Sequence, residues 1–119
     1  MDAHISGDPS EFQLLKAVET LKMLADETRL RIVWALLHGE HSVGELADHV
    51  GAKPAAVSQH LAKLRLAGLV RTRRQGVRIF YAAHNDHILQ LVEHAIFHVD
   101  HITDDVNAHE PVNHLESSA

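Results

Sequence analysis

Residues 42–70, SVGELADHVGAKPAAVSQHLAKLRLAGLV, decide the fold of this chain. Ser42 and Glu45 form a capping box, in which each side chain bonds to the backbone N–H of the other residue at the start of a helix. The apolar residues that follow recur at helical spacing until Gly51, a residue type that readily takes the left-handed conformation that ends helices. The pattern therefore predicts a short helix over residues 43–49.

A second helix follows after a tight turn. Pro54 suits its first turn, where a backbone N–H is not needed, and the helical pattern continues to about Ala67 before Gly68 ends it. Its apolar side consists of Val57, Leu61 and Leu64. Two short helices joined by a glycine turn, the second of them amphipathic and basic, are typical of a helix-turn-helix.

The period of the apolar pattern changes after the second helix from helical to alternating. Residues 69–73 and 77–82 both alternate, and residues 74–76 between them contain the glycine that a tight turn favours. This predicts a β-hairpin with a basic tip. A helix-turn-helix followed by a hairpin is a winged helix-turn-helix.

Two helices are predicted before residue 42. Ser10 and Gln13 form another capping box that opens a helix with a broad apolar face. Asp26 suits the cap of a second helix, which Gly39 ends. Trp34, within this second helix, is expected in the core.

Length and composition favour one domain, because 119 residues with 45% hydrophobic content fit a single core. We expect it over residues 10–103, mainly α-helical with a small β-hairpin, between a flexible tail at 1–9 and a histidine-containing tail at 104–119. The absence of cysteine excludes thiolate metal sites. No apolar run approaches the about 20 residues that cross a bilayer, and no secretory signal opens the chain. The sequence predicts a cytoplasmic protein with no membrane partner.

Charge is distributed unevenly along the chain. The net charge is −5, yet residues 53–78 contain seven basic residues and no acidic one. A solvated surface normally mixes charges of both signs, so this stretch favours a polyanionic partner, double-stranded DNA.

The second helix of a helix-turn-helix enters the major groove, where base edges are distinguishable. Gln59 suits a bidentate contact to adenine, and Ser58 and His60 suit contacts to bases or phosphates. The cations of the helix suit phosphates, and those of the hairpin suit the DNA backbone or the minor groove. The residues expected on DNA are Lys53, Ser58, Gln59, His60, Lys63, Arg65, Arg73, Arg74 and Arg78.

A last helix, capped by Asn85 or Asp86, is predicted to run to about Thr103. At 100° per residue, four of the twelve histidines fall within about 60° on this helix, beside an apolar stripe that suits the body or a partner helix. They are His87, His94, His98 and His101. Neutral imidazole is a good ligand for zinc, nickel, cobalt and copper, and pairs three or four residues apart chelate one ion. The stripe predicts a transition-metal site.

The segments LADETRLRI at 24–32, VSQHLAKL at 57–64 and GLV at 68–70 resemble the ArsR/SmtB family. The resemblance covers residues 12–103. It implies a homodimer that pairs through its first and last helices and represses transcription from operator DNA until a metal ion lowers its affinity.

The resemblance also implies where the metal binds. Zinc, nickel and cobalt sensors of the family place an Asp-x-His pair at the start of the last helix of one subunit against a His-x-x-His pair near its end in the other. His87, His98 and His101 match three positions, whereas Asn85 replaces the aspartate and is a poor ligand. Candidates for the open position are Asp86, His94, His109 and His114. Three or more nitrogen ligands fit tetrahedral zinc, whereas extra ligands from a histidine-rich tail favour six-coordinate nickel or cobalt. Of these ions, nickel is favoured over zinc or cobalt.

Three other kinds of function make different demands on the sequence. A metal-indifferent regulator, activator or repressor, would respond instead to pH or to a protein co-regulator. A metal carrier would not need the basic helix and hairpin. An enzyme is not expected, since the sequence has neither a His-Glu-x-x-His signature nor a glycine-rich nucleophile turn.

Overall fold

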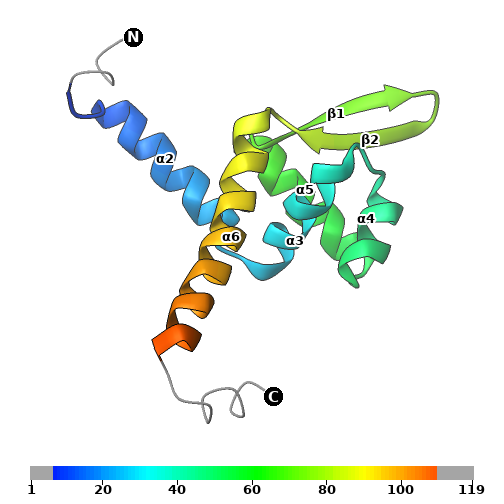
Figure 1. Cartoon of the computed structure of the whole chain (residues 1–119). Helices are drawn as coiled ribbons and strands as arrows, with labels where there is room; N and C mark the ends of the chain where they lie inside the picture. The colour runs from blue at the N-terminus through cyan, green and yellow to red at the C-terminus, as the bar shows by residue number, and fades with distance from the viewer. Residues whose placement is uncertain (1–6, 110–119) are drawn as a thin grey trace.

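The computed structural model describes residues 7–109, with side chains up to residue 106. Its elements are α2 (Glu11–Leu24), α3 (Glu27–Ala35), the 3₁₀ turn η1 (Leu36–His38), α4 (Val43–Val50), α5 (Pro54–Leu66), β1 (Val70–Gln75), β2 (Arg78–Ala83) and α6 (Asp86–His109). Helices α3, α4 and α5 form the body, the hairpin extends from one side, and α2 projects from the other (Figure 1). This mainly helical fold with a small antiparallel hairpin confirms the predicted fold class.

The helix-turn-helix forms as its capping residues predict. Ser42 Oγ accepts from the Glu45 N–H at 3.2 Å, and Glu45 Oε1 accepts from the Ser42 N–H at 2.9 Å. Gly51 ends α4 in the left-handed region with φ of 69°. Pro54 is the first residue of α5, as expected. The sequence therefore fixes both ends of the turn that sets α5 against α4.

The core lies where α3, α4 and α5 meet. Ile32, Leu46, Leu61 and Leu64 are fully buried there. Val92 from the first half of α6 joins the same cluster, so this part of α6 is fixed to the body. Complete burial of such a side chain stabilises the fold by about 2 kcal/mol, which makes the core a firm support for the outer face of α5.

The hairpin pairs in a regular antiparallel register from Val70 with Ala83 to Gln75 with Arg78. The connecting loop thus consists of Gly76 and Val77, and Gly76 has a φ of 64°. The predicted turn at 74–76 was placed too early, because a two-residue loop needs the positive φ at its first position, which only glycine takes easily. Arg74 lies in β1 as a result.

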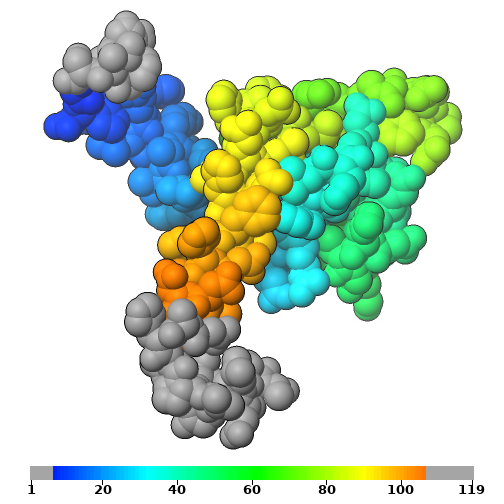
Figure 2. All heavy atoms as spheres, in the orientation of Figure 1, coloured from blue at the N-terminus to red at the C-terminus, as the bar shows by residue number. Residues whose placement is uncertain are grey.

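Helix α2 confirms its capping box, with Gln13 N–H donating to Ser10 Oγ at 3.1 Å and the Ser10 N–H donating to Gln13 Oε1 at 2.8 Å. Only its last turn packs on the core, through Met23 and Leu24. Within residues 7–109 most of its apolar face is exposed, and α2 projects away from the body in the space-filling view (Figure 2). Five large apolar side chains on it are between 46% and 67% exposed: Phe12, Leu14, Leu15, Val18 and Leu21. An apolar face of this extent in water indicates a protein–protein interface.

Helix α6 is longer than predicted, since it continues to His109 rather than ending near Thr103. Residues 104–109 contain neither glycine nor proline, so nothing in the backbone stops the helix there. Its apolar stripe divides between two environments. Val92 packs on the body, whereas Leu91, Val99 and Ile102 are exposed.

Candidate nucleic-acid interface and histidine face

The outer face of α5 presents the polar residues that were expected on DNA. Ser58, Gln59, Lys63 and Arg65 are all exposed, because the buried positions of α5 occupy its opposite side. Lys53, also exposed, is the N-cap residue and supplies no side-chain acceptor to the first turn. The N–H groups of that turn and the lysine together suit a phosphate.

His60 is the exception on this helix, since it is half-buried and turned toward α3. Its Nδ1 lies 3.3 Å from Nη1 of Arg29. A guanidinium only donates, so in this hydrogen bond His60 Nδ1 is the acceptor. The backbone N–H of Arg29 donates to Asp26 at 2.9 Å, which holds the pKa of that carboxyl below its usual value.

The Arg29 side chain connects two other elements as well. Its Nε donates to the backbone carbonyl of Met23, near the end of α2. Arg29 thus joins α2 to α5 through His60. Sequence reasoning missed this residue, because its partners lie 6 and 31 positions away and no local pattern marks them.

Arg73 in the wing is engaged by a carboxylate of the same chain. Its Nη2 and Nε donate to Glu40 Oε1 at 2.7 and 2.9 Å. The Arg73 side chain beside it holds the pKa of Glu40 below its usual value. Arg73 and Arg78 also lie over the Phe80 ring, at 4.9 and 4.7 Å from its centroid. Arg73 therefore has an internal partner that competes with a phosphate.

Arg74 and Arg78 remain exposed along the hairpin, and no ion pair within residues 7–109 involves either side chain. Glu40 was not among the residues singled out from the sequence. Glu40 lies outside the acid-free stretch at residues 53–78, so the charge pattern of that stretch gave no sign that a carboxylate reaches β1.

The histidines of α6 lie on its exposed side. His87, His94, His98 and His101 are all exposed. With a rise of about 1.5 Å per residue, His87 and His98 are about 16 Å apart along the helix axis. One ion cannot bridge them within one chain. A site that uses both ends of α6 needs a second, antiparallel copy of the helix.

The other residues considered as metal ligands do not gather around these histidines in the described part of the chain. Asn85 Oδ1 accepts from the Ile88 N–H at 3.2 Å and so caps α6. Asp86 is exposed at the first position of the helix. His109 belongs to α6 but its side chain, like all of His114, lies outside the described residues. Within the described part of the chain no three histidine or carboxylate side chains are gathered to hold an ion.

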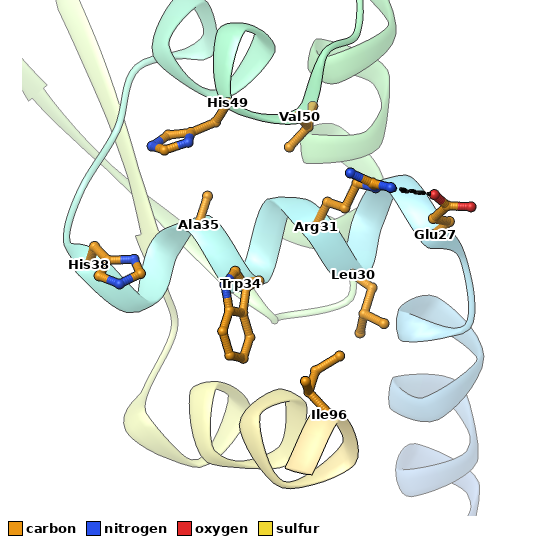
Figure 3. Close-up of a pocket in the computed structure, with 9 residues that line it drawn as sticks. All are labelled: Glu27, Leu30, Arg31, Trp34, Ala35, His38, His49, Val50 and Ile96. Carbon is orange, nitrogen blue, oxygen red and sulfur yellow. Dashed lines mark hydrogen bonds and ion pairs between the residues drawn. The ribbon is translucent and has the colours of Figure 1, made fainter. Parts of the chain in front are cut away.

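A hollow of about 480 Å³ lies between α3, α4 and α6 (Figure 3). Trp34 lines it beside Leu30 and Ile96, and is 36% exposed. The expectation that Trp34 belongs to the core was wrong. Ile32 and Val33 take the inward positions of the short α3, so the next residue falls on its flank.

These features define a class, the winged helix-turn-helix DNA-binding proteins. Residues 26–72 match the family described as bacterial regulatory protein, arsR family. Relatives of high identity cover most of the chain, and the chain belongs to this family of transcriptional regulators, which are not enzymes. No helix among residues 7–109 is long and apolar enough to span a membrane.

Two curated relatives illustrate the similarity. The HTH-type transcriptional regulator KmtR of Mycobacterium tuberculosis is 50% identical over 85% of this chain and 78% of its own length. The transcriptional activator HlyU of Vibrio cholerae is 39% identical over 76% of this chain and 88% of its own length. The chain therefore matches regulators along most of their length.

A solved structure extends the comparison to the assembly. The homodimeric winged helix-turn-helix DNA-binding domain Mb0332 of Mycobacterium bovis has a TM-score of 0.69 and 28% identity, covering 80% of this chain and 90% of that domain. That domain is homodimeric. In this chain both α2 and α6 have exposed apolar residues.

Proposed function

We propose that this chain is a homodimeric repressor that releases operator DNA in the cytoplasm when it binds a transition metal, with nickel favoured over zinc or cobalt. The observation that carries the proposal is the histidine face of α6. Four exposed imidazoles lie beside an apolar stripe that is exposed at Leu91, Val99 and Ile102. Their spacings along the helix are too long for one chain to close around one ion. A partner helix would cover the stripe and bring the ligands together.

DNA binding is assigned to α5 and the wing. Gln59 and Ser58 face the major groove, and the exposed cations contact phosphates: Lys53, Lys63, Arg65, Arg74 and Arg78. Arg73 contributes less in this proposal, because Glu40 holds it. His60 serves to set α5 against α3 as well as to face DNA.

The metal site is assigned to His87 of one subunit with His98 and His101 of the other. Imidazole nitrogen suits zinc, nickel and cobalt, and a bound ion would supply fixed charge and a bridge between subunits. Asn85 is committed to capping α6, so a further ligand would come from Asp86, His94, His109 or His114. Nickel is favoured because it accepts six such ligands, whereas structural zinc takes four.

Metal binding is linked to DNA binding through the geometry of the dimer. An ion that bridges two α6 helices favours one relative orientation of the subunits, and with it one separation of the two α5 helices. Helices that read successive major grooves must stand about 34 Å apart, so a change in this separation weakens binding. A coupling of about 1 to 3 kcal/mol is ordinary for such linkage.

Complementation between subunits tests the shared site. The variants His87→Ala and His98→Ala each lose both sites of the dimer. When the two proteins are mixed and allowed to exchange subunits, each heterodimer regains one complete site. Nickel binding should therefore recover to about a quarter of the wild-type amount in an equal mixture, where half the dimers are mixed. A mixture that binds no more nickel than the separate variants would exclude a shared site.

A second candidate is a metal-indifferent regulator, activator or repressor, that responds to pH or to a protein co-regulator. It is supported by the role of Asn85 as a helix cap and by the similarity to HlyU, which is named an activator. This candidate predicts that operator affinity is unchanged by every metal ion.

A further inference from the structure

Side chains of the types that can bind metal ions also lie close together at α4, away from α6. His41 precedes the helix, and Glu45, Asp48 and His49 follow on it. The four residues line a shallow hollow of about 360 Å³. Residues at intervals of four face the same side of a helix, which places Glu45 and His49 above one another with His41 at the helix start.

Distances within this group match those of ligands that share an ion. His41 Nδ1 lies 3.5 Å from Glu45 Oε1. The ring centroids of His41 and His49 are 5.3 Å apart. Two imidazoles on one tetrahedral zinc ion have centroids about 5 Å apart, given metal–nitrogen bonds of about 2 Å. The two rings now meet edge to face, and their spacing is compatible with two imidazoles that share an ion.

His41 is held in place by its backbone. Its N–H donates to the carbonyl of Tyr81 at 3.0 Å, and its carbonyl accepts from the Tyr81 N–H at 2.8 Å. The Nε2 atom of His41 is buried and has no hydrogen-bond partner in the described part of the chain. The other ring nitrogen, Nδ1, faces Glu45 and interacts with its carboxylate, so an ion shared with Glu45 would bind His41 through Nδ1.

We propose that His41, Glu45 and His49 bind one divalent transition-metal ion within a single subunit, with Asp48, which lines the same hollow, as a further ligand. The side chains are not yet gathered around one point. His49 is exposed, so a rotation about its side-chain bonds is enough to bring its ring nitrogen to the ion. This site goes beyond the proposed function, since it needs neither the second subunit nor α6.

The location gives such an ion a mechanical consequence. Through His41 the ion would tie α4 to Tyr81 on β2, at the base of the wing. Glu40, the residue before His41, already holds Arg73 of β1. Metal binding at α4 would therefore stiffen the attachment of the wing to the body.

Zinc binding to full-length protein tests the site, in a background that carries His87→Ala, His98→Ala and His101→Ala. Affinity is measured by competition with a chromophoric chelator. Adding His49→Ala to this background should weaken binding of one zinc ion per subunit at least tenfold. The matched change His84→Ala, at an exposed histidine outside the group, should leave it unchanged. Histidines of the chain ends are the same in all these proteins, so the difference reports α4 alone.

A second variant controls for the possibility that a substitution weakens zinc binding by disturbing the fold. Glu45→Gln preserves the capping box, because glutamine also bonds to the Ser42 N–H, but removes the carboxylate ligand. It should weaken zinc binding like His49→Ala. Zinc should also slow hydrogen exchange at the Tyr81 amide in the background protein and not in either variant. Equal zinc affinity in the His49→Ala and His84→Ala proteins would overturn the proposal, without bearing on the site shared by the α6 helices.

Discussion

Lys63 offers the most direct test of how α5 meets DNA. It lies on the outer face of α5, is exposed, and takes part in no ion pair within residues 7–109. If it contacts a phosphate, replacing it with alanine removes one contact per subunit and two per dimer. The expected change is in the salt dependence of binding, because each phosphate contact releases condensed counterions.

The magnitude follows from the number of contacts. Each contact contributes about 0.9 to the slope of log affinity against log salt, so Lys63→Ala should reduce that slope by about 1.8. Between about 50 and about 200 mM salt, wild-type affinity should therefore fall about tenfold more than the affinity of the variant. The effect should be the same on operator and on random duplexes, since phosphates carry no sequence information.

Fluorescence anisotropy with a labelled duplex, repeated over a series of salt concentrations, measures the slope. Arg31→Ala is the matched control, because Arg31 is an exposed cation outside the basic stretch that pairs with Glu27 at 2.7 Å. Arg73→Ala should change the slope less than Lys63→Ala, since Glu40 already neutralises Arg73. A slope for Lys63→Ala equal to that of Arg31→Ala would refute the phosphate assignment.

Three further predictions concern the fold and the dimer. Leu61→Ala should lower the free energy of unfolding by about 2 to 5 kcal/mol in urea, because Leu61 is fully buried, and the same change at the exposed Leu66 should have little effect. The Arg29 N–H lowers the folded-state pKa of Asp26, so the charge of Asp26 stabilises the fold above the unfolded pKa, and this stabilisation is lost as pH falls. The difference in the free energy of unfolding between wild type and Asp26→Asn should therefore shrink below about pH 4. A constant difference would contradict the assignment. Val18→Glu places a charge on the apolar face of α2 and should shift the protein toward monomer in sedimentation, whereas an unchanged dimer would exclude that face from the interface.

The parts of the fold that local chemistry determines were predictable from the sequence. Ser10 with Gln13 and Ser42 with Glu45 form the expected capping boxes, because their partners lie three residues away. Gly51 ends α4 in the left-handed conformation that a residue without Cβ takes most easily. Patterns of this kind act within one turn of helix and need no knowledge of the tertiary structure.

Contacts between distant segments could not be predicted. Arg73 was expected to be free for DNA, yet its partner Glu40 is 33 residues away. His60 similarly meets Arg29 across 31 residues. Both pairs depend on how the wing and α5 pack on α3 and the loop before α4. No periodicity in the sequence encodes that packing, so the internal competition for these side chains appears only in the structure.

Two errors have local physical causes. Trp34 was expected in the core, but the neighbouring positions of α3 face inward and Trp34 borders a hollow instead. The end of α6 was placed near Thr103, although the next residues contain no helix breaker and the helix continues to His109. The helical spacing of the histidines indicated the candidate metal ligands on α6. Because His87 and His98 were already expected on one helix, their separation along its axis follows from the sequence prediction itself.

The central claim is that a metal ion sets the affinity of this protein for its operator. It is tested most directly by measuring the affinity of the purified dimer for its own upstream DNA, with and without stoichiometric nickel or zinc, at one salt concentration. The account predicts that nickel lowers the affinity tenfold or more, and that zinc has a smaller effect. Tight binding that is the same in the presence of either metal and in its absence would contradict it, and would assign the histidines of α6 to another role.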